Sequence, residues 1–165
     1  MSRRHRRSHT VEGAGGGSEQ WEYHIVEWFA EWYPRHHGIV APLEERRELL
    51  NKFQGSKKLD PRLGHDVSWF STNPRNGTVE RVTLGSEDIV EAWNKAHDHP
   101  LRVAREQIAR LVRLVARKRT SKPLIVVSGG TARNPGVKEQ IKKACEAHNL
   151  PVLFTDEFKV SIQYE

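Results

Sequence analysis

A run of four apolar residues followed directly by a glycine turn constrains the fold of this chain more than any other feature. The run is Leu124–Val127, and the turn at 128–131 reads Ser-Gly-Gly-Thr. A short apolar run rich in β-branched residues is typical of a strand buried on both faces of a sheet. Asn134 then predicts a helix N-cap and Pro135 the first helical position. With a second apolar segment at 151–154, the order strand, turn, helix, strand indicates an α/β fold.

The N-terminal part of the chain predicts two helices. Aromatic and aliphatic residues in Trp21–Tyr33 recur at the spacing of an amphipathic helix, which Pro34 is expected to end. Pro42 is suited to the first turn of a second helix, which we expect to reach about Lys57. Trp21, Trp28, Phe29 and Trp32 are expected either to join the core or to form an exposed patch that binds a protein partner.

A hairpin and a long helix are predicted next. Strands are expected around Val67 and at 78–84, because the Asn-Pro-Arg-Asn-Gly stretch at 73–77 is strong turn chemistry. Ser86 predicts the cap of a helix that continues to about residue 115. Pro100 lies within it, so a kink or two abutting helices are expected.

Charge and composition separate a tail from the rest of the chain. The 165 residues carry a formal charge of +6, and four of the basic residues are Arg3, Arg4, Arg6 and Arg7. Residues 1–19 have almost nothing to bury, so we predict a disordered basic, Gly-rich tail and a domain at 20–165. A solvated tail is favoured over a nucleic-acid-binding arm.

Other classes of protein and site are disfavoured. No stretch approaches the roughly 20 apolar residues of a membrane span, and the single cysteine, Cys145, excludes an internal disulfide and suits a cytoplasmic protein. A metal site needs three or four converging ligands. The close histidines, His36 with His37 and His97 with His99, do not supply them, so no metal site and no catalytic residue is assigned.

The glycine turn has a chemical use. Adjacent glycines after a strand let the backbone approach a ligand that a Cβ atom would block. The free N–H groups and positive dipole end of the following helix favour an anion. On physical grounds alone, however, glycine is also common in ordinary turns.

The complete string at 127–137, Val-Ser-Gly-Gly-Thr-Ala-Arg-Asn-Pro-Gly-Val, resembles the adenosine-facing motif of the seventy-kilodalton heat-shock chaperone family. The segments at 86–93 and 53–58 resemble elements that precede the motif in that family, and the resemblance covers about residues 45–150. It implies an α/β fold that is part of the second lobe of an actin-like, ribonuclease-H-like ATPase domain, a mixed sheet packed with helices.

The resemblance also implies a role for each residue of the turn. Gly129 and Gly130 would lie against the ribose and α-phosphate of ATP or ADP, followed by Thr131. Arg133 would place its planar guanidinium over the adenine ring, since arginine stacks well on flat π-systems.

Upstream residues would complete the adenosine site. Lys57 and Lys58 would cover the other face of the adenine. Gln54 stands where the family usually has a carboxylate for the ribose hydroxyls, and its amide can still form a hydrogen bond with a hydroxyl. Pro61 stands about where the family offers a hydroxyl to the base, so that contact is expected to be absent.

The chain departs from the family in what it lacks. Nothing matches the family's phosphate hairpin, lysine and metal-orienting carboxylates, so Mg²⁺ would bind only if a complete site existed. The peptide-binding domain has no match either. We therefore expect the ATP-binding part of a heat-shock-70-like chaperone or ATPase, a fragment without catalysis of its own. The alternatives are a non-catalytic binding or regulatory module of the same fold and a small basic nucleic-acid-binding protein.

Overall fold

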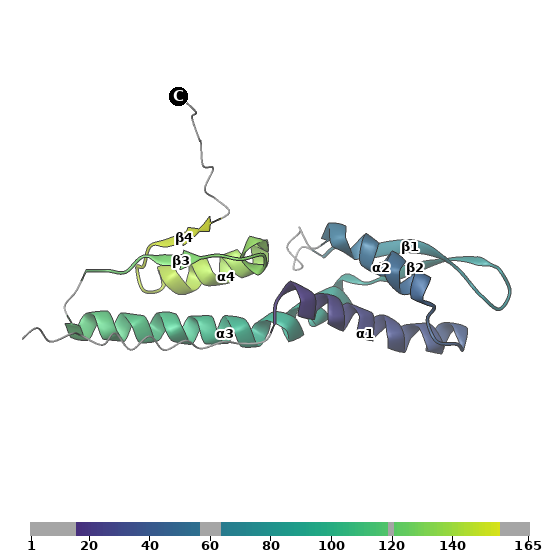
Figure 1. Ribbon diagram of the computed structural model, residues 1–165, viewed down its shortest axis with the longest axis horizontal. Helices are drawn as coiled ribbons and strands as arrows, with labels where there is room; N and C mark the ends of the chain where they lie inside the picture. The colour runs from purple at the N-terminus through teal and green to yellow at the C-terminus, as the bar shows by residue number, and fades with distance from the viewer. Residues whose placement is uncertain (1–15, 57–63, 119–120, 156–165) are drawn as a thin grey trace, which may run out of the picture.

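The computed structural model describes residues 16–56, 64–118 and 121–155, and this part of the chain is a mixed α/β structure that is mostly helical. Four α-helices and two small two-stranded sheets make up these residues (Figure 1). In chain order the elements are α1 (Ser18–His37), α2 (Leu43–Ser56), β1 (Val67–Thr72), β2 (Val79–Leu84), α3 (Ser86–Lys118), β3 (Ile125–Val127), the 3-10 turn η2 (Thr131–Arg133), α4 (Pro135–Glu146) and β4 (Val152–Phe154).

The molecule is elongated, and α3 runs along most of its length. Figure 1 shows α1, α2 and the β1–β2 hairpin gathered at the N-terminal half of α3, and β3, α4 and β4 at its C-terminal half. Two hydrophobic clusters are present. A large cluster joins α1, α2, the hairpin and α3 as far as Leu101, and it reaches Val137 of α4; a small one centres on Ile108, Cys145 and Leu150.

Helix α1 supplies the centre of the large cluster. Trp21, Ile25, Phe29 and Tyr33 recur every four residues and are buried, as the amphipathic pattern predicts. Trp28 and Trp32 are partly buried and pack against the same cluster. Most of this aromatic stripe is therefore core, and the alternative expectation of an exposed Trp-rich patch is wrong.

Pro34 does not end α1, which was predicted to stop there. The helix continues to His37 and closes at Gly38, whose φ of 67° is left-handed. The Gly38 N–H donates to the Pro34 carbonyl at 2.8 Å. A proline so close to a helix end removes one intrahelical hydrogen bond, and the Gly38 closure stabilises the last turn.

The β1–β2 hairpin is confirmed. The strands are antiparallel, with Val67 opposite Leu84 and Thr72 opposite Val79. Gly77 adopts a φ of 71°, which favours glycine, and the Asn73 N–H donates to the Thr78 carbonyl at 2.7 Å.

Helix α3 passes through Pro100 as one element of 33 residues, so of the two expected outcomes, a kink or two abutting helices, the second is wrong. Proline lacks an N–H, which leaves the Ala96 carbonyl without its usual helical donor. The Gly17 N–H donates to that carbonyl at 3.2 Å. A segment about 80 residues upstream therefore satisfies the group that the proline leaves open.

The start of α3 also differs from its prediction. Ser86 is the first helical residue rather than the residue before the helix. Its amide donates to a side-chain oxygen of Asp66 at 2.7 Å, so the acceptor comes from the segment that precedes β1.

Of the predicted tail at 1–19, residues 1–15 lie outside the described residues. Residues 16–19 are described, and α1 begins at Ser18, so the predicted boundary lies too far along the chain. Gly17 is buried beside α3, where its amide makes the contact with the Ala96 carbonyl.

Strands β3 and β4 pair in parallel, with Ile125 opposite Val152. The prediction of a strand buried on both faces is wrong, because Leu124 and Val126 are 53% and 58% exposed. Among the described residues this sheet has only two strands. One face packs on the small cluster through Ile125 and Val152, and on the other face Val126 is exposed among the described residues.

Candidate functional site

The two glycines of the turn after β3 adopt different conformations. Gly129 has a φ of +106°, a region that side-chain-bearing residues rarely adopt, whereas Gly130 is right-handed helical with φ −60° and ψ −43°. A Cβ atom added at either residue would meet no heavy atom within 4 Å. Ser128, Gly129 and Gly130 are exposed, so the turn presents open backbone to its surroundings.

The turn is held from within by successive short-range hydrogen bonds. The Ala132 N–H donates to the Gly129 carbonyl at 3.2 Å, and the Arg133 N–H donates to the Gly130 carbonyl at 3.1 Å. These are the bonds of the 3-10 turn η2, which fixes Arg133 one turn beyond the glycines. Within the described residues, the amides of Gly130 and Thr131 have no hydrogen-bond acceptor.

Helix α4 begins as predicted, with Asn134 as its N-cap and Pro135 in its first turn. The Asn134 side-chain oxygen accepts from the Gly136 N–H at 2.9 Å and from the Val137 N–H at 3.3 Å. Since Pro135 has no N–H, the amides at this helix end are already occupied. The expected anion site at the N-terminus of α4 is therefore wrong, and any free amides belong to the glycine turn.

The side chains of Thr131 and Arg133 in η2 differ in their exposure. Arg133 is exposed, whereas Thr131 is half-buried against the start of α1. A Cβ atom added at Gly17 would lie 2.7 Å from the Thr131 hydroxyl oxygen. Gly17 thus lies beside the turn, a position that no local signal in the sequence predicts.

The structure brings Gly129, Gly130, Thr131 and Arg133 together but does not bring Gln54 into contact with them. Gln54 lies in the last turn of α2 and donates to a carboxylate oxygen of Glu22 at 2.9 Å. In Figure 1 the C-terminal end of α2 is directed toward the half of the molecule that holds α4. The other residues expected at the adenine, Lys57 and Lys58, lie outside the described residues, as does Pro61.

Other reactive groups are buried in the two cores. Burial raises the pKa of the Cys145 thiol, so the cysteine is a core residue as expected. His97 is buried and stacked on Trp93, and burial lowers the pKa of its imidazole. The part of the chain that the structure describes contains no group of three His, Cys, Asp or Glu residues that could hold a metal ion. Among these residues, no helix has the length and hydrophobicity that a membrane crossing needs.

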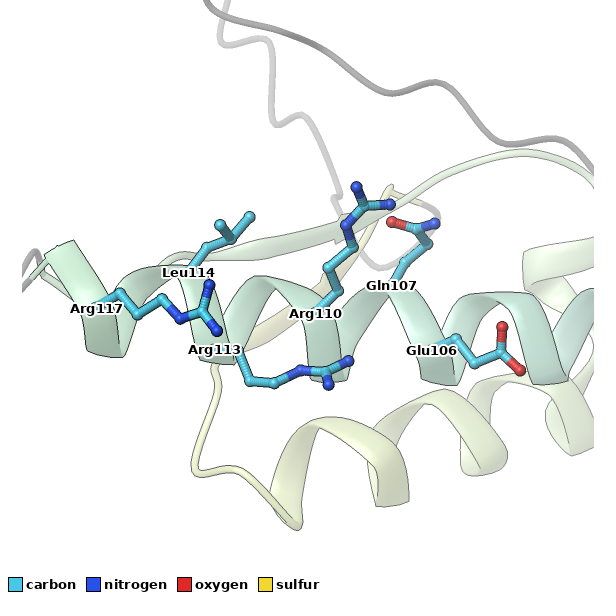
Figure 2. Close-up of a pocket in the computed structure, with 6 residues that line it drawn as sticks. All are labelled: Glu106, Gln107, Arg110, Arg113, Leu114 and Arg117. Atoms are coloured by element: carbon cyan, nitrogen blue, oxygen red, sulfur yellow. The ribbon is translucent and has the colours of Figure 1, made fainter.

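A second surface feature lies on the C-terminal half of α3. Figure 2 shows Arg110, Arg113 and Arg117 extending from successive turns of the helix, with Leu114 and Gln107 beside them. Together with Glu106, these residues line a shallow groove. Sequence reasoning missed this groove, because basic residues near the C-terminal end of a helix are ordinarily explained by the helix dipole.

Comparison with known proteins assigns no family. No protein-family model matches the chain, and no curated protein matches it. A function for this chain therefore has to rest on the geometry of the turn and on the resemblance of its sequence.

Proposed function

We propose that the turn at 128–133 is one side of an adenine-nucleotide site in a heat-shock-70-like, actin-like ATP-binding protein. The observation that carries this proposal is the conformation of Gly130. Its backbone is one that any residue adopts, and the space over its Cα is open. The fold has no need of a glycine at this position, whereas a ligand lying against the backbone does.

Gly129 supports the same proposal in a different way. Its positive φ is what directs the chain from the end of β3 into η2. Gly129 is therefore required by the turn, and Gly130 extends a surface without side chains directly beyond it. Because two consecutive glycines have no side chains, the edge of a flat ring or a ribose can approach the backbone there.

Arg133 is the residue proposed to contact the base. It is exposed and fixed at the end of η2 by the bond from its amide to the Gly130 carbonyl. A guanidinium group is planar and weakly hydrated, so it stacks on aromatic rings more readily than a lysine ammonium does.

The geometry favours the adenosine part of the ligand over its phosphates. Asn134 occupies the amides of α4 that would otherwise attract an anion. The amides of Gly130 and Thr131 remain as donors for one phosphate oxygen. Adenosine should therefore bind about as well as ATP.

The binding is expected to be weak, and this chain is not proposed to catalyse hydrolysis. A typical site encloses most of its ligand, and the turn offers one wall. A Kd of about 1 mM or weaker corresponds to roughly 4 kcal/mol. We also propose that the parallel β3–turn–α4–β4 unit is part of the second lobe of an actin-like ATPase domain. The exposed apolar face of β3 supports this, because the sheet of such a lobe has more strands and is covered on both faces.

The test is an NMR titration of the parent, Gly130→Val and Arg133→Ala with ATP and with adenosine. Both ligands should shift the amides of 129–133 in the parent. Gly130→Val should abolish the shifts with the fold intact. Arg133→Ala should weaken them while changing stability by less than about 0.5 kcal/mol. Arg47→Ala on α2 is the matched control and should bind like the parent.

Two results would refute the proposal. The first is a parent chain whose turn amides do not shift at high millimolar ligand. The second is an Arg133→Ala variant that unfolds, since Arg133 would then be a structural residue.

A further inference from the structure

The long helix α3 carries a stripe of charged residues in two groups. When the helix is read in the reverse direction, each charge of one group meets the opposite charge of the other group. In its N-terminal half the stripe is Asp88, Glu91 and Lys95, and in its C-terminal half it is Glu106, Arg110 and Arg113. The spacings are three and four residues in the first group, then four and three in the second. Residues at these spacings lie on one face of a helix. Asp88 is half-buried, and the other five residues are exposed.

The two ends of the molecule also carry opposite net charge. Among the described residues, 16–56 and 64–98 contain 13 Asp and Glu against 7 Lys and Arg. The remaining described residues, 99–118 and 121–155, contain 3 Asp and Glu against 11 Lys and Arg. The acidic end holds a groove between α1 and α3 that is lined in part by Glu27, Glu31 and Glu91. The basic end holds the arginine groove of Figure 2.

We propose that this face of α3 binds a second copy of the chain in antiparallel orientation. A two-fold axis between residues 100 and 101 places Asp88 opposite Arg113 of the second copy. The same axis places Glu91 opposite Arg110 and Lys95 opposite Glu106. All three pairs join opposite charges, and the symmetry makes each of them twice.

The pairs cannot form within one molecule. Asp88 and Arg113 are separated by 25 helical residues, or about 37 Å at 1.5 Å per residue. These pairings therefore require a second molecule. An antiparallel copy pairs every charge of both groups with an opposite charge. A nucleic acid would be attracted to the basic half and repelled by Asp88 and Glu91.

Exposed ion pairs are individually weak and are screened by salt. Glu91 and Lys95 already form an ion pair along the helix at 2.6 Å. In the dimer, Arg110 of the second copy would add to Glu91 and Glu106 of the second copy would add to Lys95. The association should therefore depend on all the pairs together and should fall steeply as salt is added. Sedimentation equilibrium of the full chain over a concentration series tests this directly. Dimers are expected at low salt, and monomers in about 1 M salt, where the screening length is about 3 Å.

Charge reversal tests the proposed pairing residue by residue. Arg113→Glu and Asp88→Arg each turn two attractive pairs into repulsive ones, so each should weaken association by about tenfold or more. The double variant Asp88→Arg/Arg113→Glu restores opposite charges and should dimerise like the parent. Arg47→Glu on α2 changes the net charge as Arg113→Glu does and should have no effect.

An independent swap guards against a variant that folds poorly. Lys95→Glu and Glu106→Lys should each weaken the dimer, and the combination should restore it, with circular dichroism checking the helix content of every variant. A parent that stays monomeric at low salt would overturn the proposal. So would double variants that remain as dissociated as the single ones. Tight oligonucleotide binding that Asp88→Arg strengthens, without any dimer, would instead assign the face to a nucleic acid.

Discussion

Asn134 connects the glycine turn to α4, and its replacement by alanine should destabilise the fold by about 2 kcal/mol. Loss of an N-cap side chain typically costs about 1 kcal/mol, with a range of roughly 0.5–2. Here the side-chain oxygen serves two amides, on Gly136 and Val137, and both of these residues are buried. A buried donor without an acceptor costs about 1–3 kcal/mol, which places this cap at the upper end of the range.

Urea denaturation followed by circular dichroism measures the effect. With a slope of about 2 kcal/mol per molar urea, a loss of about 2 kcal/mol moves the midpoint by about 1 M. Asn134→Asp is the matched control, because it keeps an oxygen acceptor and adds a negative charge at the positive end of α4. It should change stability by less than about 0.5 kcal/mol.

The reasoning would be refuted if Asn134→Ala moved the midpoint no more than Asn134→Asp does. It would also be refuted if the aspartate variant were as unstable as the alanine variant, because the side-chain acceptor would then not be the stabilising group.

Two further changes probe the turn and the large core. Gly129→Ala should lower the free energy of unfolding by about 1–2 kcal/mol, because the φ of Gly129 is positive. Gly130→Ala should leave it unchanged or raise it by up to about 1 kcal/mol. Urea midpoints that fall equally for both variants would contradict the assigned conformations. Because burial lowers the pKa of His97, the unfolded chain binds its proton more readily. The stability that neutral His97 provides is complete above the unfolded pKa of about 6.5 and is lost as the pH falls below it. His97→Phe should therefore flatten the decline in urea midpoint between about pH 7 and 5, and a decline as steep as in the parent would show that His97 does not cause it.

The elements that could be predicted from sequence are those whose signals are local. The Asn134-Pro135 start of α4, the Asn-Gly turn of the hairpin and the four-residue aromatic repeat of α1 each act within one or two turns of chain. The turn at 129–133 is also contiguous, so its candidate residues are brought together whatever the remainder of the chain does.

The features that could not be predicted depend on distant segments. Pro100 is tolerated because the Gly17 N–H donates to the Ala96 carbonyl, and no residue near Pro100 in the sequence predicts this contact. The exposure of Val126 depends on how many strands join β3, which a single apolar run does not specify. The position of Gln54 likewise depends on the packing of α2.

The anion site expected at α4 could have been excluded from the sequence itself. Asn134 was predicted to cap α4, and the same helix end was expected to offer free amides to an anion. A side chain that caps these amides removes them from a ligand, so the two expectations exclude each other.

Pro100 acts as a docking point between two distant parts of the chain. By withholding its own N–H, it leaves the Ala96 carbonyl as an acceptor on the side of α3, and the amide just before α1 takes it at 3.2 Å. This contact sets where α1 begins relative to α3, and it also sets the Gly17 backbone against Thr131. Alanine at position 100 would return the acceptor to its own helix and leave the buried Gly17 amide in need of another. The proline that weakens the helix thereby specifies the alignment of the helices around it.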